Sequence, residues 1–121
     1  MGDSVRVAEA RDAGGRATTW VYRFDHPARG DNGGLGACHG AEVPFVFGTI
    51  GRADVRALIG DPPSQAVAGT AHAAWVSFVR DGAPGWSPYT VDGRVTGLLT
   101  DEINEAGDPS GEERVLWDGI R

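Results

Sequence analysis

The distribution of apolar and polar positions predicts strands interleaved with short helices. Residues 3–15 (DSVRVAEARDAGG) carry a weak helical period and predict a helix that stops at a pair of glycines. The β-branched and aromatic run at 18–27 (TTWVYRFDHP) predicts a strand that Pro27 ends. Residues 28–36 (ARGDNGGLG) follow as a loop. The apolar run at 41–48 (AEVPFVFG) is too short for its period to separate helix from strand.

The clearest element in the sequence is a helix over residues 64–81. Ser64 is typical of an N-cap, and Gly82 is typical of the residue that follows a helix. The apolar residues within this span recur at helical spacing and form one stripe, so we expect the stripe to be buried. Its members are Val67, Ala71, Ala74, Trp75, Phe78 and Val79.

Three weaker patterns complete the expected elements. Residues 50–63 (IGRADVRALIGDPP) predict a short turn or helix closed by paired prolines. The Asp-Gly pair within residues 87–100 (SPYTVDGRVTGLLT) predicts a hairpin turn between two extended segments. Residues 108–120 (DPSGEERVLWDGI) predict a short final helix with a capping box and two apolar anchors. The cap, its partner and the anchors are Ser110, Glu113, Leu116 and Trp117.

Composition and charge narrow the class of protein. The 121 residues suit one domain, and the pattern of elements indicates an α/β layered fold with few strands. The chain has 11 arginines, no lysine and 17 acidic residues, for a net charge of −6. This negative charge disfavours binding to nucleic acid or to an anionic membrane, because both need a cationic surface. No apolar stretch reaches the roughly 18 residues of a membrane span and no segment has the pattern of a secretory leader, so we expect a soluble protein that is cytoplasmic rather than secreted.

The candidate chemistry centres on His39, one of three histidines. It stands among small residues directly after the glycine-rich loop, a setting that leaves a ring accessible to a partner from another loop. The single cysteine, Cys38, excludes an internal disulfide and is expected to be a buried, unreactive thiol. We expect His26 and His72 to be structural or surface residues. These residues lack the spacing of metal ligands, and the chain lacks the lysine of a phosphate-binding loop, so no metal and no cofactor are expected.

Three stretches resemble one protein family, in order along the chain. They are YRFDHPARGDNGGLGACHGAEVPFVFG at 22–48, AWVSFVRDGAPG at 74–85 and DPSGEERVLWDGI at 108–120. Together they resemble the C-terminal portion of type B carboxylesterases, the α/β-hydrolase family that includes bacterial aryl esterases and the cholinesterases. The resemblance begins near Val5, and GACHGAEVPFVFG is its most specific part. It implies that residues 1–121 are a single C-terminal segment of an α/β-hydrolase domain, with few strands, flanking helices and an incomplete sheet.

The resemblance implies a catalytic role for His39. In this family the histidine of the motif is the general base of a triad that also contains a serine and an acid. An imidazole suits this task because it takes up and returns a proton near neutral pH. Glu42, three residues later, also matches the motif, and the resemblance implies that it has a supporting hydrogen-bonding role.

The other parts of such a site are missing from the sequence. No serine lies in a G-x-S-x-G elbow; Ser87 comes nearest, with Gly85 two residues before it but Tyr89 two residues after it. The glycine-rich oxyanion loop of the family is absent. Only 38 residues precede His39, which leaves little room for the acid that the family places on an earlier strand.

Two functions from different classes therefore remain open at this point. In the first, the chain is part of a carboxylic-ester hydrolase, and the isolated chain is inactive because the serine and the acid come from elsewhere. In the second, it is a catalytically inactive truncated remnant or an interaction module. The expected partners are a carboxylic ester, bound only with the missing N-terminal part, and either a complementing half or a second copy in a homodimer. Either protein partner would cover the edge of the strand at 18–27.

Overall fold

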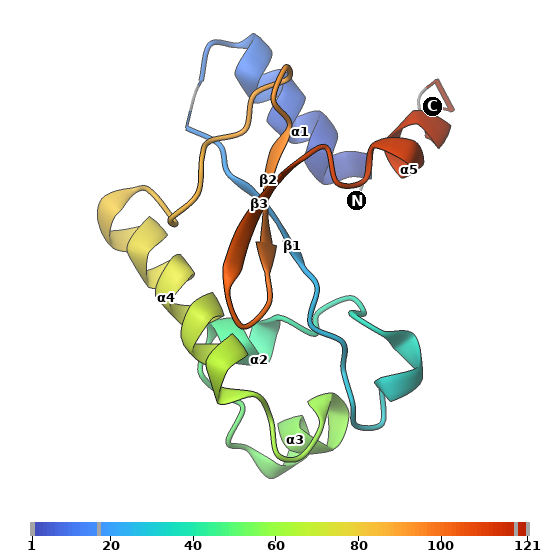
Figure 1. Ribbon diagram of the computed structural model, residues 1–121, viewed down its shortest axis with the longest axis vertical. Coiled ribbons are helices and arrows are strands. Elements are labelled where there is room, and N and C mark those ends of the chain that lie inside the picture. Colours follow the sequence, from blue (N-terminus) through green and yellow to red (C-terminus); the bar gives the residue numbers. More distant parts are fainter. Residues whose placement is uncertain (1, 17, 118, 121) are drawn as a thin grey trace.

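The computed structural model describes residues 2–16, 18–117 and 119–120. Its elements are α1 (Gly2–Ala13), β1 (Val21–Phe24), the 3-10 turn η1 (Gly33–Leu35), α2 (Val43–Val46), α3 (Ala53–Ile59), α4 (Gln65–Asp81), β2 (Val95–Leu99), β3 (Ile103–Gly107) and α5 (Gly111–Leu116). Figure 1 shows the strands at the centre, α1 and α5 toward one end, α2 and α3 toward the other, and α4 along one side. The predicted α/β architecture, with few strands and flanking helices, is confirmed.

The three strands form one sheet in the order β1-β2-β3. β1 runs parallel to β2, with Val21 opposite Thr96, and β2 runs antiparallel to β3. The strand predicted at 18–27 is confirmed, although its paired part is shorter. Within the described residues, β1 has a neighbouring strand along one edge only.

Side chains of β1 alternate between two environments, as the two-residue period of a strand requires. Tyr22 and Phe24 pack against the hydrophobic core together with Trp20, the residue before the strand. Arg23 serves the other face, where its guanidinium donates a hydrogen bond to the Pro109 carbonyl oxygen at 3.2 Å. Different elements therefore cover the two faces of β1.

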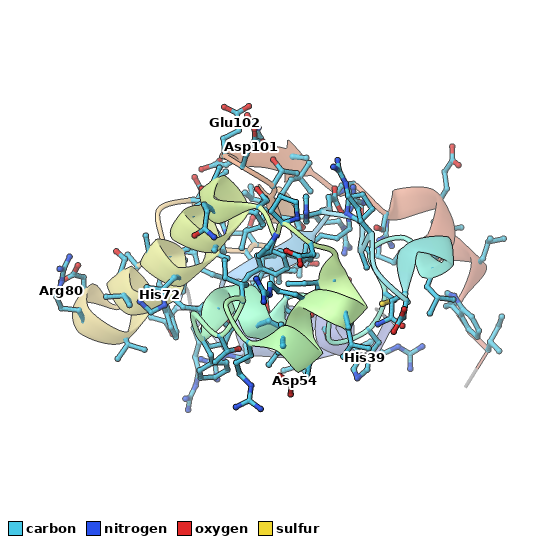
Figure 2. All side chains as sticks on the ribbon, turned by 90° about the horizontal axis from the view of Figure 1, so that it is seen from below. His39, Asp54, His72, Arg80, Asp101 and Glu102 are labelled. Atoms are coloured by element: carbon cyan, nitrogen blue, oxygen red, sulfur yellow. The ribbon has the colours of Figure 1, made fainter. Side chains whose placement is uncertain are left out.

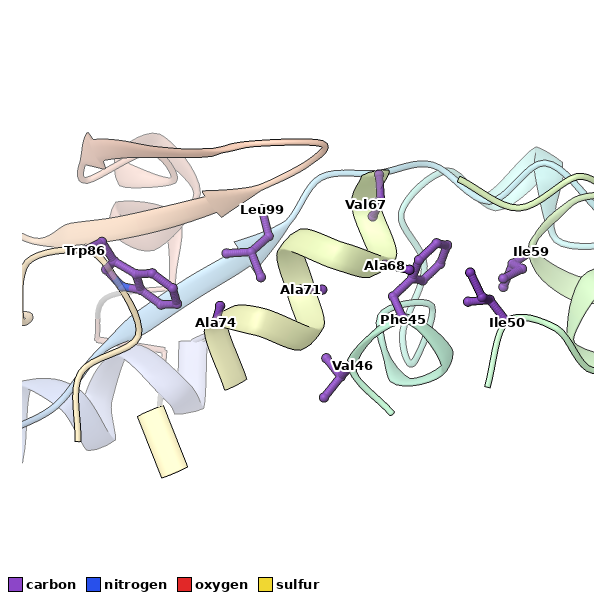
Figure 3. Close-up of a cluster of buried hydrophobic side chains, with 10 residues drawn as sticks. All are labelled: Phe45, Val46, Ile50, Ile59, Val67, Ala68, Ala71, Ala74, Trp86 and Leu99. Atoms are coloured by element: carbon purple, nitrogen blue, oxygen red, sulfur yellow. The ribbon is translucent and has the colours of Figure 1, made fainter. Parts of the chain in front are cut away.

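The core lies between α2, α4 and the sheet (Figure 3). Phe45 of α2, Ala71 of α4 and Leu99 of β2 are almost completely buried, and burial of a large apolar side chain stabilises the fold by about 1.5–3 kcal/mol. His72 also joins the two helices, since its ring Nδ1 lies 2.8 Å from the Val46 carbonyl oxygen. These contacts hold α2, and the segment just before it, against the sheet.

Helix α4 confirms the clearest prediction from the sequence. The Ser64 hydroxyl accepts a hydrogen bond from the Val67 amide at 3.3 Å, and Gly82 takes a left-handed φ of 73° just beyond the last turn. The helices predicted near the two ends of the chain are present as α1 and α5, and the segment at 50–63 contains α3. Local signals therefore indicated α1, α4 and α5 as helices. For α3 the sequence left turn and helix open, and for α2 it left helix and strand open.

The prediction that the whole apolar stripe of α4 is buried is wrong for half of its members. Three residues are buried: Val67, Ala71 and Ala74. The other three are 39%, 41% and 80% exposed: Trp75, Phe78 and Val79. The sheet ends at β1, so no further strand among the described residues extends beneath this part of the helix.

The predicted hairpin about the Asp-Gly pair is also wrong. The hairpin joins β2 to β3 through residues 100–102, and the segment at 87–91 forms no strand in the described structure. Instead, the Tyr89 amide donates a hydrogen bond to the Thr19 carbonyl oxygen at 2.7 Å, and the Tyr89 ring is buried. The segment is thereby held at the start of β1 and cannot pair with β2.

The final helix is present, but its predicted apolar anchors are wrong. Leu116 and Trp117 are mostly exposed. Polar contacts hold this part of the chain instead: Arg114 pairs with Asp108 at 2.8 Å, and the Ser110 hydroxyl accepts a hydrogen bond from Arg23 at 3.3 Å. These contacts orient α5 so that its apolar side chains face outward.

Candidate active site

His39 occupies the second position of a tight turn between η1 and α2. The Ala41 amide donates to the Cys38 carbonyl oxygen at 3.1 Å and closes the turn, while Gly40 takes a left-handed φ of 77° at the third position. Ala41 and Phe45 are buried and fix the chain after the turn. His39 itself is exposed, which confirms its predicted place in a loop after the strand.

His39 opens onto a trough of about 670 Å³ that runs along β1. Residues 19–24 line its length, and the segment between η1 and α2 passes beside the carboxyl end of β1 (Figure 1). The remaining walls are made by Ser4, Val7 and Ala8 of α1 and by residues 37–40 with Glu42. The His39 ring makes no hydrogen bond or ion pair with any residue that the structure describes. Its two nitrogens are therefore open to groups that enter the trough.

Glu42 lies on the same wall of the trough as His39. Burial raises the pKa of the Tyr22 hydroxyl, the Glu42 carboxylate raises that pKa further, and a hydrogen bond with Trp75 lowers it. The Glu42 carboxylate is thus within electrostatic reach of the β1 side chains. No hydrogen bond joins Glu42 to His39 among the described residues, and its supporting role stays a prediction.

The other two histidines belong to the packing of the fold. His26 lies edge-on to Phe24 and Phe45, with ring centroids 6.2 and 5.6 Å apart. Burial lowers the pKa of His26, and the charge of Arg29 lowers it further, while Asp101 opposes the shift. His72, bound to the α2 backbone, lies far from His39 (Figure 2). The structure therefore brings neither of them to the trough.

The remaining candidate groups do not assemble a second site. Cys38 is half-buried rather than buried, and it lines the trough beside His39. Ser87, the nearest match to a nucleophile elbow, is bound at 3.1 Å to the Glu105 carboxylate. Across residues 2–16, 18–117 and 119–120, no three His, Cys, Asp or Glu side chains gather as metal ligands. No helix in this part of the chain is long and apolar enough to cross a membrane.

Sequence reasoning found His39 but missed the surface in front of it. The walls contributed by Val7 and Tyr22 come from elements distant from His39 in the sequence. The run at 18–27 indicated the strand that carries Tyr22, but no local signal indicates that α1 borders the same trough. The site is therefore a product of tertiary packing.

Comparisons with curated proteins find similarity to two hydrolases. No protein-family model matches the chain. The para-nitrobenzyl esterase of Bacillus subtilis is 34% identical over 116 residues, which are 89% of this chain and 23% of that protein. The phenmedipham hydrolase of Pseudarthrobacter oxydans is 32% identical over 106 residues, which are 80% of this chain and 21% of that protein.

Solved structures agree with these sequence matches. A carboxylesterase of Geobacillus stearothermophilus superposes with a TM-score of 0.76 and 32% identity, over 94% of this chain and 24% of that one. A structure of PNB esterase gives a TM-score of 0.64 and 31% identity, over 79% of this chain and 21% of that one. The fold is thus part of an α/β-hydrolase. In sequence and in fold, the chain matches part of carboxylesterase-type proteins, and it spans less than a quarter of the length of these relatives.

Proposed function

We propose that this chain contributes the general-base histidine of a carboxylic-ester hydrolase, and that His39 is that residue. The nucleophilic serine, the acid and the oxyanion-hole donors come, in this proposal, from residues outside the 121. The observation that carries it is the exposed turn of the GACHGAEVPFVFG stretch, which directs His39 into a trough beside the sheet. The esterase relatives support the choice of substrate class. We assign Glu42, on the same wall, a supporting hydrogen-bonding role.

The proposed chemistry is acyl transfer through a serine. The His39 imidazole accepts the hydroxyl proton of the serine while the serine oxygen bonds to the carbonyl carbon of the ester. The imidazolium then returns this proton to the departing alcohol oxygen as the ester C–O bond breaks, which leaves an acyl-serine. A water molecule next gives a proton to His39 and attacks the acyl carbon. The proton returns to the serine, and the carboxylic acid leaves.

The open ring of His39 suits these steps. A triad histidine needs one nitrogen for the hydroxyl and the other for an orienting acid. Both nitrogens of His39 are without partners among the described residues, and both are carried by a turn whose following residues are buried. The chain therefore holds the base in place and leaves room for both partners.

A covalent chimera tests this proposal. The chain replaces the aligned part of the Bacillus subtilis para-nitrobenzyl esterase, and hydrolysis of para-nitrophenyl acetate is followed. We expect the folded chimera to turn over ester and His39→Ala to lower kcat by at least about 10³-fold, because the serine loses its base. Arg80→Ala, at an exposed side chain of α4 outside the trough, is the control and keeps most of the activity. A folded chimera that is inactive, or that is indifferent to His39→Ala, favours the remnant or interaction module instead.

A further inference from the structure

The outer edge of β1 presents backbone groups that no described strand pairs with. The Asp25 amide donates to the Leu99 carbonyl oxygen of β2 at 3.0 Å. Because backbone groups of a strand point alternately to its two sides, the amide of Arg23 also faces β2, whereas those of Tyr22 and Phe24 face the trough. An exposed edge of this kind readily pairs with another strand.

Apolar hollows flank this edge on both faces of β1. On the α4 face, a hollow of about 110 Å³ is walled mainly by aromatic rings: Trp20, Tyr22, Trp75, Phe78 and Trp86. On the α1 face, Val7 and Ala8 line the trough beside Val21. A strand that lies about 4.8 Å from β1 sends alternate side chains to opposite faces. Apolar side chains of such a strand would enter both hollows.

We propose that the trough binds one apolar strand that runs parallel to β1. This strand belongs to the remaining part of a carboxylesterase-type sheet, which is a separate polypeptide. This inference rests on the proposed function. The Geobacillus stearothermophilus carboxylesterase contains the arrangement seen in 94% of this chain, and about three quarters of that enzyme lies outside the match. A parallel strand extends the β1–β2 pairing, and helices on both faces are typical of parallel sheets.

A second copy of the chain fits this edge less well. The edge is recessed, because α1 and the turn that carries His39 both form walls of the trough. Two recessed edges cannot approach to pairing distance without a collision of their walls. Two copies, each with a net charge of −6, also repel one another. The shape and the charge therefore disfavour a second copy as the occupant of this edge.

The parallel orientation connects this docking surface to the site. The carboxyl ends of parallel strands lie at the same edge of a sheet, where α/β proteins bind ligands. The loop that follows the docked strand therefore lies beside the carboxyl end of β1, where His39 opens onto the trough. Docking would place residues of the partner within reach of the open ring.

Co-expression tests the docking directly. The probe is the Bacillus subtilis para-nitrobenzyl esterase without the residues aligned to this chain, captured through a tag on this chain. We expect this chain to capture the probe. Val7→Glu places a charge in the hollow on the α1 face, and Trp75→Glu places one in the hollow on the α4 face, so we expect either variant to reduce the amount of captured probe at least tenfold. The matched controls are Ala10→Glu on α1 and Val79→Glu on α4. Both are exposed residues outside the hollows, and their variants retain capture.

Amide exchange followed by NMR gives a second readout that needs no variant. In the chain alone, we expect the amides of Tyr22 and Phe24 to exchange fast and the amide of Arg23 to be protected. When the probe is captured, we expect the exchange rates of the Tyr22 and Phe24 amides to fall at least tenfold. Three results would overturn the proposal. The probe is not captured, its capture is unchanged by both charged variants, or these amides become protected in a discrete homodimer. Capture without ester hydrolysis leaves docking intact and contradicts the proposed function. If the covalent chimera is active but the separate chain is not captured, the proposed function holds and the docking proposal is overturned.

Discussion

Trp20 and Trp86 are joined by a hydrogen bond from the Trp20 indole N–H to the Trp86 carbonyl oxygen at 3.0 Å. The Trp86 indole in turn donates to the Val21 carbonyl oxygen, also at 3.0 Å. This reciprocal pair ties a segment far along the chain to the start of β1. It also forms part of the aromatic hollow beside the strand. The strand that borders the candidate site is therefore held by side chains on the face where α4 lies.

Trp86→Phe tests the contribution of this link to stability. The substitution keeps an aromatic ring but removes the N–H donated to Val21, so we expect the free energy of unfolding to fall by about 1–2 kcal/mol. Urea unfolding followed by circular dichroism measures the change. Trp117→Phe, at a side chain that is mostly exposed, is the control and should have little effect. Equal stability of the two variants would contradict the account.

Gly97→Ala tests the close approach of Trp86 to the sheet. A Cβ atom at position 97 would lie 2.7 Å from Trp86 Cδ2, so the ring must shift, and we expect a loss of about 1–3 kcal/mol. Gly69→Ala provides a contrast, because that glycine is in α4 with open space around it. There, alanine should stabilise the helix by about 0.5–1 kcal/mol. Thermal unfolding of both variants shows whether the signs differ.

Gly40→Ala tests the turn that presents His39. Gly40 has a φ of 77°, which costs a residue with a side chain about 1–2 kcal/mol, so we expect a loss of stability of that size. Gly34→Ala is the control, since Gly34 has open space and no positive φ. In the covalent chimera, Gly40→Ala should also lower ester hydrolysis, because the base is displaced. An unchanged melting temperature would show that the turn is not restrained as described.

The lowered pKa of His26 predicts a dependence of stability on pH. The unfolded chain binds the proton more readily than the folded chain, whose His26 has a pKa below the ordinary 6.5. Stability present above about pH 6.5 is therefore lost as the pH falls below that value. We expect His26→Phe to show a smaller drop in Tm between about pH 7.5 and 5.5 than the original chain. A drop of the same size in both proteins would exclude His26 as the cause.

Local sequence signals predicted the elements whose ends depend on nearby residues. Ser64 and Gly82 bound α4 because a cap and a left-handed glycine act within one turn. The hairpin was misplaced for the opposite reason: a contact between Tyr89 and Thr19, distant in sequence, removes the segment before the Asp-Gly pair from the sheet. β3 escaped prediction because none of its five residues is buried, so apolar alternation is weak.

Burial and the shape of the site depend on what packs against each element. The apolar spacing of α4 correctly indicated buried residues up to Ala74, but Trp75, Phe78 and Val79 of the same stripe remain exposed. His39 was found through its motif. The trough in front of it joins β1, α1 and the turn, and no local pattern encodes that meeting.

The rate of ester hydrolysis by the captured pair decides whether His39 acts as the general base of a site completed by a second polypeptide. The chain and the separate remainder of the Bacillus subtilis esterase are purified together, and para-nitrophenyl acetate is the substrate. We predict saturable turnover by the pair, no more than the rate of free imidazole for the chain alone, and a loss of at least about 10³-fold in kcat for His39→Ala with capture unchanged. Saturable turnover by the chain alone, or a pair whose rate survives His39→Ala, would contradict the account.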